Sequence, residues 1–142
     1  MMDEELIEKK IDMILRNLDY LEEIKEIDDE EFLRSFEKVQ ATKHSLQEVI
    51  ESCIDISNHM ISSEGWERAE TYSEIFERLY ENDVIGKELN DRLGNMARFR
   101  NLLVHRYGII DDKKVLHILR GRLEDIYSFV EVIEKILDES SD

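Results

Sequence analysis

Proline is absent from this 142-residue sequence, and glycine and cysteine are scarce, with five residues and one residue respectively. Proline breaks helices and glycine weakens them, so long helices are permitted along most of the chain. The single cysteine, Cys53, excludes an intrachain disulfide and any zinc site built from several thiolates. We therefore expect a protein of a reducing compartment, and the length fits one domain spanning residues 1–142.

Long apolar runs are also missing. The N-terminal segment Met1–Leu6 is acidic and no apolar run follows it, so no signal peptide or membrane span is visible. Hydrophobic residues nevertheless make up 42% of the sequence, which argues against disorder. These features predict a soluble cytoplasmic protein without a membrane partner.

Basic residues are outnumbered, and the formal net charge of −16 opposes nucleic-acid binding by the bulk of the surface. The segment from Arg92 to Arg122 differs from the rest, because it holds eight basic and two acidic residues, a net charge of +6 that leaves −22 for the remainder. This polarity fits two alternatives: a docking face for an acidic neighbour, or a site for a polyanion.

Hydrophobic residues recur at spacings of three and four along most of the chain, which is the period of an α-helix. Candidate N-terminal caps are Asp28, Thr71 and Asp111 or Asp112, and Gly108 is a candidate helix stop. The predicted elements are a helix over 4 to about 26, a longer helix from 28 to about 62 with Phe32 and Phe36 on its apolar side, a short helix over 71–80, a fourth helix from about 87 to 108, and a final helix from 111 or 112 to 137. The sequence thus predicts an all-α antiparallel four-helix bundle with an additional short helix.

A metal site finds no support in the spacing of the histidines. Ferritin-like bundles place a Glu three residues before a His, whereas the residues three before the four histidines here are Ala41, Ile56, Leu102 and Lys114. Glycine-rich phosphate loops are absent as well. We expect no metal and no cofactor.

The predicted fourth helix carries a charged residue on its apolar side. Its apolar stripe runs through positions 89, 93, 96, 100 and 103, so Arg100 stands where a hydrophobic residue is expected. Burying an unpaired guanidinium is costly, so Arg100 either meets a carboxylate or lines a cleft or a subunit interface. Asn101 and His105 share a neighbouring face, and Arg98 lies near it.

These residue types suit the cleavage of RNA without a metal. Imidazole titrates near neutrality and can take the 2′-hydroxyl proton, and a guanidinium fits the oxygens of a phosphate. In a continuous helix, however, Arg100 and His105 would diverge by roughly 140°. Either the helix ends before His105, or two copies of the helix face each other across a symmetry axis.

The segment Arg100-Asn-Leu-Leu-Val-His105-Arg-Tyr107 resembles the R-x4-H-x-Y signature of the HEPN superfamily, specifically that of the HepT-like ribonuclease toxins. Supporting similarity lies in residues 53–59 and 71–76, in the turn at 84–86 and in residues 110–111. The resemblance runs from roughly residue 5 to residue 138 and so covers nearly the whole chain.

The resemblance implies a HEPN-like helical bundle that forms a homodimer, in which the motifs of two copies build a composite cleft for RNA. His105 would be the general base and Arg100 the phosphate stabiliser. The partner would be a minimal nucleotidyltransferase (MNT) antitoxin that adds AMP to the motif tyrosine, here Tyr107. The added bulk and negative charge would block a phosphate-binding cleft.

The candidates for a supporting role around this cleft are Asn101, Asp55, Asn58, His59 and Arg98. Asn58 or Asp55 could orient His105 or pair with Arg100, and Asp55, Asn58 and His59 could instead form an internal polar network. Arg98 is an alternative to Arg100 as the phosphate-binding cation. A second function also stays open, that of a non-catalytic helical subunit that holds a nucleotidyltransferase, which the overall acidity favours.

Overall fold

The computed structural model describes residues 2–105 and 110–140, and these residues form seven helices and no strands. In chain order the helices are α1 (Glu4–Lys25), α2 (Asp29–Arg34), α3 (Phe36–Glu64), α4 (Tyr72–Glu81), α5 (Lys87–Val104), α6 (Asp112–Gly121) and α7 (Leu123–Ser140). The predicted all-α bundle is confirmed. Across the same residues, no helix combines the length and the apolar character that crossing a bilayer would need.

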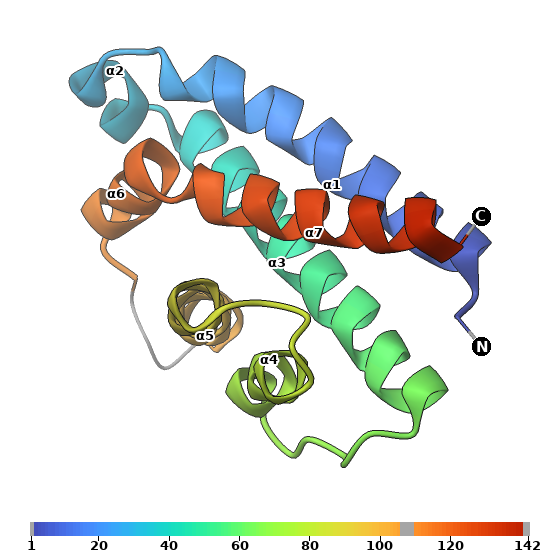
Figure 1. Cartoon of the computed structure of the whole chain (residues 1–142). Coiled ribbons are helices and arrows are strands. Elements are labelled where there is room, and N and C mark those ends of the chain that lie inside the picture. The colour runs from blue at the N-terminus through green and yellow to red at the C-terminus, as the bar shows by residue number, and fades with distance from the viewer. Residues whose placement is uncertain (1, 106–109, 141–142) are drawn as a thin grey trace.

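The long helices pack as a bundle around one core. Helices α1 and α3 form an antiparallel hairpin, and α7 lies across them (Figure 1). Helix α5 crosses beneath α7 and packs against α3 and α4 (Figure 1). The core is therefore enclosed by α1, α3, α5 and α7. Each of these helices belongs to one of the four main helices that the periodicity predicted.

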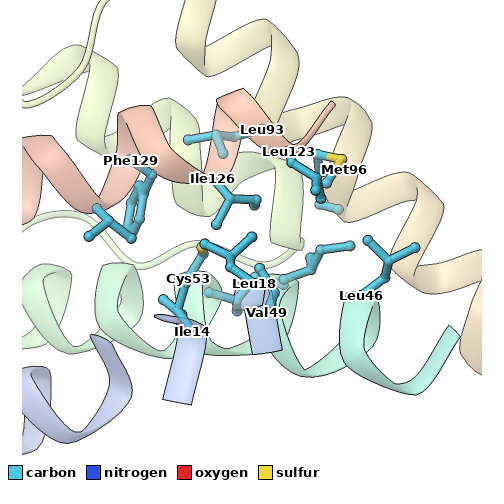
Figure 2. Packing of buried hydrophobic residues seen from close by; sticks show 14 of the residues in the cluster. Ile14, Leu18, Leu46, Val49, Cys53, Leu93, Met96, Leu123, Ile126 and Phe129 are labelled. Atoms are coloured by element: carbon cyan, nitrogen blue, oxygen red, sulfur yellow. The ribbon is translucent and has the colours of Figure 1, made fainter. Parts of the chain in front are cut away.

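The apolar stripes of these four helices meet in one cluster (Figure 2). Its central members come from α1 (Ile14 and Leu18), α3 (Leu46, Val49 and Cys53), α5 (Leu93 and Met96) and α7 (Leu123, Ile126 and Phe129). The thiol of Cys53 lies in this cluster, and its burial raises the pKa of the thiol. A buried, protonated thiol is unreactive, so Cys53 serves as a core residue.

Three predicted caps begin helices. Asp28 accepts a hydrogen bond from the backbone N–H of Glu30 at the start of α2, Thr71 accepts one from Glu74 in α4, and Asp111 accepts one from Lys113 in α6. These side chains satisfy N–H groups that have no partner within the helix.

The predicted second helix is not continuous. Ser35 adopts an extended conformation (φ −97°, ψ 103°) between α2 and α3, and its hydroxyl accepts a hydrogen bond from the N–H of Lys38. The break turns the two flanking phenylalanines apart: Phe32 is fully buried, whereas Phe36 is 78% exposed. The expectation that both lie on the apolar side is wrong for Phe36.

Two further helix ends differ from expectation. The predicted final helix breaks at Arg122 (φ −123°, ψ 0°), directly after Gly121, into α6 and α7. The predicted fourth helix ends at Val104, and its predicted stop, Gly108, lies outside the described residues. The second difference matters for the site, because it places His105 outside the helix.

Candidate functional site at the end of helix α5

His105 is the residue at which α5 stops. Its backbone is extended (φ −83°, ψ 122°), while its N–H still bonds to the carbonyl oxygen of Asn101 at 3.1 Å. This hydrogen bond and the near-helical φ keep the Cβ of His105 on the helical spiral, so Arg100 and His105 still leave α5 in different directions. The arrangement in which two copies of the helix face each other stays a prediction. The His105 side chain is exposed.

Arg100 projects from α5 towards α3 and α4. Its Nη2 lies 3.5 Å from Glu51 Oε1, and its Nη1 donates to Asn101 Oδ1 at 3.3 Å. The guanidinium carbon stands 4.9 Å from the centroid of the Tyr72 ring, within the range of a cation–π contact. A carboxylate and an aromatic face thus offset part of the cost of placing this cation on the apolar stripe.

The carboxylate that Arg100 meets is Glu51, where the sequence had offered Asp55 or Asn58. Asp55 accepts from Lys10 Nζ at 2.9 Å, and His59 Nε2 accepts from the N–H of Asp3 at 2.9 Å. Both side chains therefore tie α3 to the N-terminal segment. Asn58 is exposed and lines a surface pocket with Trp66 and Arg68.

Arg98 belongs to a different part of the surface. It donates to Asn95 Oδ1 and to Ser73 Oγ, the latter at 3.5 Å, beside a polar pocket between α4 and α5. Arg98 and Arg100 are two residues apart and thus lie roughly 160° apart around the helix. Arg98 keeps its own partners and does not share those of Arg100.

Glu51 and Tyr72 are the two site residues that sequence reasoning missed. The sequence analysis assigned neither residue a role in the site. The available signal for Glu51 was its position one helical turn before Asp55. That spacing does not indicate which of the two acids pairs with Arg100, because the pairing depends on the angle and position at which α3 and α5 cross.

Several cations of the basic segment are committed to structural contacts. Arg120 Nη2 donates to the carbonyl oxygen of Ile27 at 2.6 Å and to Asp29 at 2.7 Å, and Nη1 donates to the carbonyl oxygen of Lys25. Arg120 thereby satisfies carbonyl groups at the C-terminal end of α1. The side chains of Lys113 and Lys114, in contrast, are exposed near the start of α6. Only part of the +6 charge is therefore presented to solvent.

Acidic and metal-ligating residues do not cluster near this site. Within residues 2–105 and 110–140, no group of three or more His, Cys, Asp or Glu side chains is placed to hold a metal ion. Tyr107, the expected modification site, lies outside the described residues.

Comparison with known proteins identifies the family. The family model described as Ribonuclease HepT-like matches residues 14–133 of the chain. The chain belongs to the HepT-like ribonuclease family. The family resemblance of the Arg100–Tyr107 motif is confirmed, and so is the expected enzyme class, a ribonuclease.

Two relatives align with most of this HepT-like chain. A tRNA nuclease HepT of Aphanizomenon flos-aquae is 30% identical over 132 residues, which cover 93% of this chain and 90% of the relative. An mRNA nuclease HepT of Shewanella oneidensis is 31% identical over 107 residues, which cover 75% and 80% of the two chains.

Solved structures show the same HepT-like fold. A tri-AMPylated HEPN toxin of Shewanella oneidensis in complex with its MNT antitoxin superposes with a TM-score of 0.86 at 30% identity, covering 95% of this chain and 99% of that one. A toxin–antitoxin complex with AMP-PNP superposes with a TM-score of 0.85 at 28% identity, covering 92% and 98%. YutE of Bacillus subtilis, a cytosolic protein of unknown function, shares the fold with a TM-score of 0.84 at 20% identity, covering 98% and 93%.

Proposed function

We propose that this HepT-like chain is the RNA-cleaving toxin of a toxin–antitoxin pair and that it acts as a metal-independent endonuclease. The observation that carries this proposal is the end of α5, where the helix stops at Val104 and leaves an exposed imidazole five residues beyond a fixed guanidinium. The two nuclease relatives and the solved toxin–antitoxin complexes support it.

The chemistry follows from the two side chains. His105 removes the proton of a ribose 2′-hydroxyl, and the 2′ oxygen attacks the adjacent phosphorus. The bond from phosphorus to the 5′ oxygen breaks, the 5′ oxygen takes up a proton from solvent, and a 2′,3′-cyclic phosphate remains. Arg100 binds the phosphate oxygens, on which negative charge builds up in the transition state. His105 then releases its proton to water.

The site proposed here is composite, with two copies of the chain contributing to one cleft. Leu102 and Val104, at the end of α5 beside His105, leave 41% and 38% of their surface exposed. Apolar side chains next to a polar site are a suitable centre for a subunit contact. A homodimer around this end of α5 would bring two histidines and two arginines to the same groove.

Tyr107 is the proposed target of an MNT-type nucleotidyltransferase partner. It lies two residues after His105 in the sequence, and the tri-AMPylated Shewanella toxin supports AMPylation as a modification of this chain. An added AMP carries a negative phosphate and a large base, so it would exclude RNA phosphates from the neighbourhood of Arg100.

The test is cleavage of tRNA and mRNA by the purified chain, free of any partner, in the presence of a metal chelator. We expect cleavage by the wild type and its loss in His105→Ala, with a product that ends in a 2′,3′-cyclic phosphate. Because His105 is exposed at a helix end, the variant should fold normally, which circular dichroism checks. Unchanged cleavage by the variant would show that the assigned roles are wrong.

Two observations favour a second function, that of a non-catalytic subunit that holds a nucleotidyltransferase. Arg100 is engaged by Glu51, and the chain carries a net charge of −16, both of which oppose RNA binding. Capture of the protein encoded by the neighbouring gene, together with absence of cleavage by the wild type, would support this alternative.

A further inference from the structure

Arg100 lies in a cradle formed by residues from three helices. Glu51 of α3 contacts Nη2, the ring centroid of Tyr72 of α4 lies 4.9 Å from the guanidinium carbon, and Asn101 of α5 accepts from Nη1. Glu51 is itself held, because Gln47 Nε2 donates to its two carboxylate oxygens at 3.0 and 3.4 Å. The cradle thus has a fixed acidic wall and an aromatic floor.

The residues of the cradle contact Arg100 but leave the hydrogen-bonding capacity of its guanidinium poorly satisfied. Charge-assisted hydrogen bonds normally measure about 2.7–2.9 Å, whereas the contacts of Nη1 and Nη2 measure 3.3 and 3.5 Å. The Nε atom is buried and has no hydrogen-bond partner among the described residues. Only 16% of the Arg100 side chain is exposed. The guanidinium is therefore desolvated without the strong pairing that usually compensates for it.

A phosphate would improve on this pairing. A phosphodiester offers two non-bridging oxygens that share one negative charge and match the fork of a guanidinium, whereas Glu51 reaches only Nη2 and only at 3.5 Å. To bind such a phosphate, Arg100 must loosen its contact with Glu51, because a carboxylate beside the bound phosphate repels it. Glu51 and the RNA backbone thus compete for one cation.

We propose that Glu51 is a positioning residue that holds Arg100 in a retracted position and acts as an internal competitor of the RNA phosphate. This inference rests on the proposed function, because it assigns Arg100 to phosphate binding. Glu51 then sets the affinity for RNA, and Tyr72 keeps the guanidinium plane in place while its partner changes. When RNA is absent, Glu51 remains the partner of Arg100, so the cation on the apolar stripe of α5 is not left unpaired.

The test measures binding apart from cleavage. The probe is a fluorescent 2′-O-methyl RNA oligonucleotide, which has no 2′-hydroxyl to deprotonate, and the readout is its Kd. Glu51→Gln should bind it about three- to tenfold more tightly than the wild type, the range for loss of one partly exposed charge contact. In the Arg100→Ala background the same substitution should change the Kd by less than about twofold.

The matched control is Glu48→Gln, which removes the same charge from the same helix. Glu48 lies 3.9 Å from His44 and not beside Arg100, and its side chain is 34% exposed against 28% for Glu51. Equal tightening by both substitutions, or equal tightening with and without Arg100, would overturn the proposal in favour of a general charge effect. Unchanged or weaker binding by Glu51→Gln would overturn it as well.

Kinetics on cleavable RNA separate this inference from the proposed function. Glu51→Gln should lower KM without raising kcat, because Gln cannot fix the guanidinium as a carboxylate does. If the wild type cleaves RNA and KM is unchanged in the variant, the inference fails alone. If no variant cleaves RNA but the Arg100-dependent tightening is found, the proposed catalysis fails and the competition for phosphate stands.

Discussion

Arg92 of α5 and Asp125 of α7 form an ion pair across the bundle, with Nη1 3.4 Å from Oδ1. The two sides differ in exposure, because 45% of the Arg92 side chain is exposed but only 4% of that of Asp125. The second oxygen of Asp125 is buried and has no hydrogen-bond partner among the described residues. Burial raises the pKa of Asp125 above its ordinary value of 3.8, and the nearby Arg92 and Arg122 offset only part of that rise.

This arrangement predicts how stability changes with pH. A carboxyl whose pKa is raised in the folded state binds protons more readily there than in the unfolded chain. Its favourable contribution is therefore complete below pH 3.8 and is lost as the pH rises through the raised pKa. Asp125→Asn should increase the free energy of unfolding at neutral pH by on the order of 1 kcal/mol. The difference from the wild type should shrink towards acidic pH in urea titrations.

Glu124→Gln is the control for this substitution. It removes an exposed charge from the same first turn of α7, and because that charge contributes only a minor part of the rise in the pKa of Asp125, its stability gain should be the smaller one. A stability gain in Glu124→Gln that matches the gain in Asp125→Asn would show that helix-terminal charge, and not burial, is responsible.

Mixing two inactive variants distinguishes a composite site from a site within one chain. Arg100→Ala should reduce cleavage by about a hundredfold or more, as loss of one transition-state donor does, and His105→Ala should abolish it. Coexpressed in equal amounts, the two variants should recover roughly a quarter of wild-type cleavage, because half of randomly formed dimers are mixed and each has one complete site. Recovery is measured on the same RNA substrate with chelator present.

No recovery in dimers shown to be mixed would contradict the composite arrangement. It would favour a site in which each chain uses its own Arg100 and His105. Tandem purification of differently tagged copies isolates the mixed dimers, for which the expected recovery is roughly a half of wild-type cleavage.

Phe32 and Phe36 offer a matched test of the break at Ser35. Phe32→Ala should lower the free energy of unfolding by about 3–5 kcal/mol, because it empties a buried site. Phe36→Ala should change it by no more than about 0.5 kcal/mol, because Phe36 is 78% exposed. Urea denaturation of both variants gives the comparison. Similar large losses in both would mean that α2 and α3 form one helix with both rings inside.

Gly65 ends α3 in the left-handed conformation, with φ +69°. No atom would clash with an added Cβ, so the expected loss of about 1 kcal/mol in Gly65→Ala comes from backbone strain alone. Gly121→Ala, within α6 and equally open, should instead stabilise the protein by about 0.5–1 kcal/mol. Thermal denaturation should therefore shift the two midpoints in opposite directions, and a shift in the same direction would contradict this account.

The sequence by itself determined what depends on short-range interactions. The absence of proline and the three-to-four spacing of apolar residues gave an all-α bundle, and Asp28, Thr71 and Asp111 marked true helix starts because a cap bonds to N–H groups only two or three residues away. The Arg100–Tyr107 motif identified the family for the same reason, since it is contiguous.

Only the tertiary structure decided how the helices break and which side chains meet between them. Phe32 and Phe36 are spaced to share a helical face, and only the turn at Ser35 separates them. Glu51 and Asp55 likewise lie one turn apart on α3, yet Arg100 meets the first and Lys10 the second. A periodic sequence pattern does not distinguish two residues that lie one helical turn apart, because both are on the same face. In the structure, however, the two are separated by about 6 Å along the helix axis. The crossing of α3 with α1 and α5 selects between them.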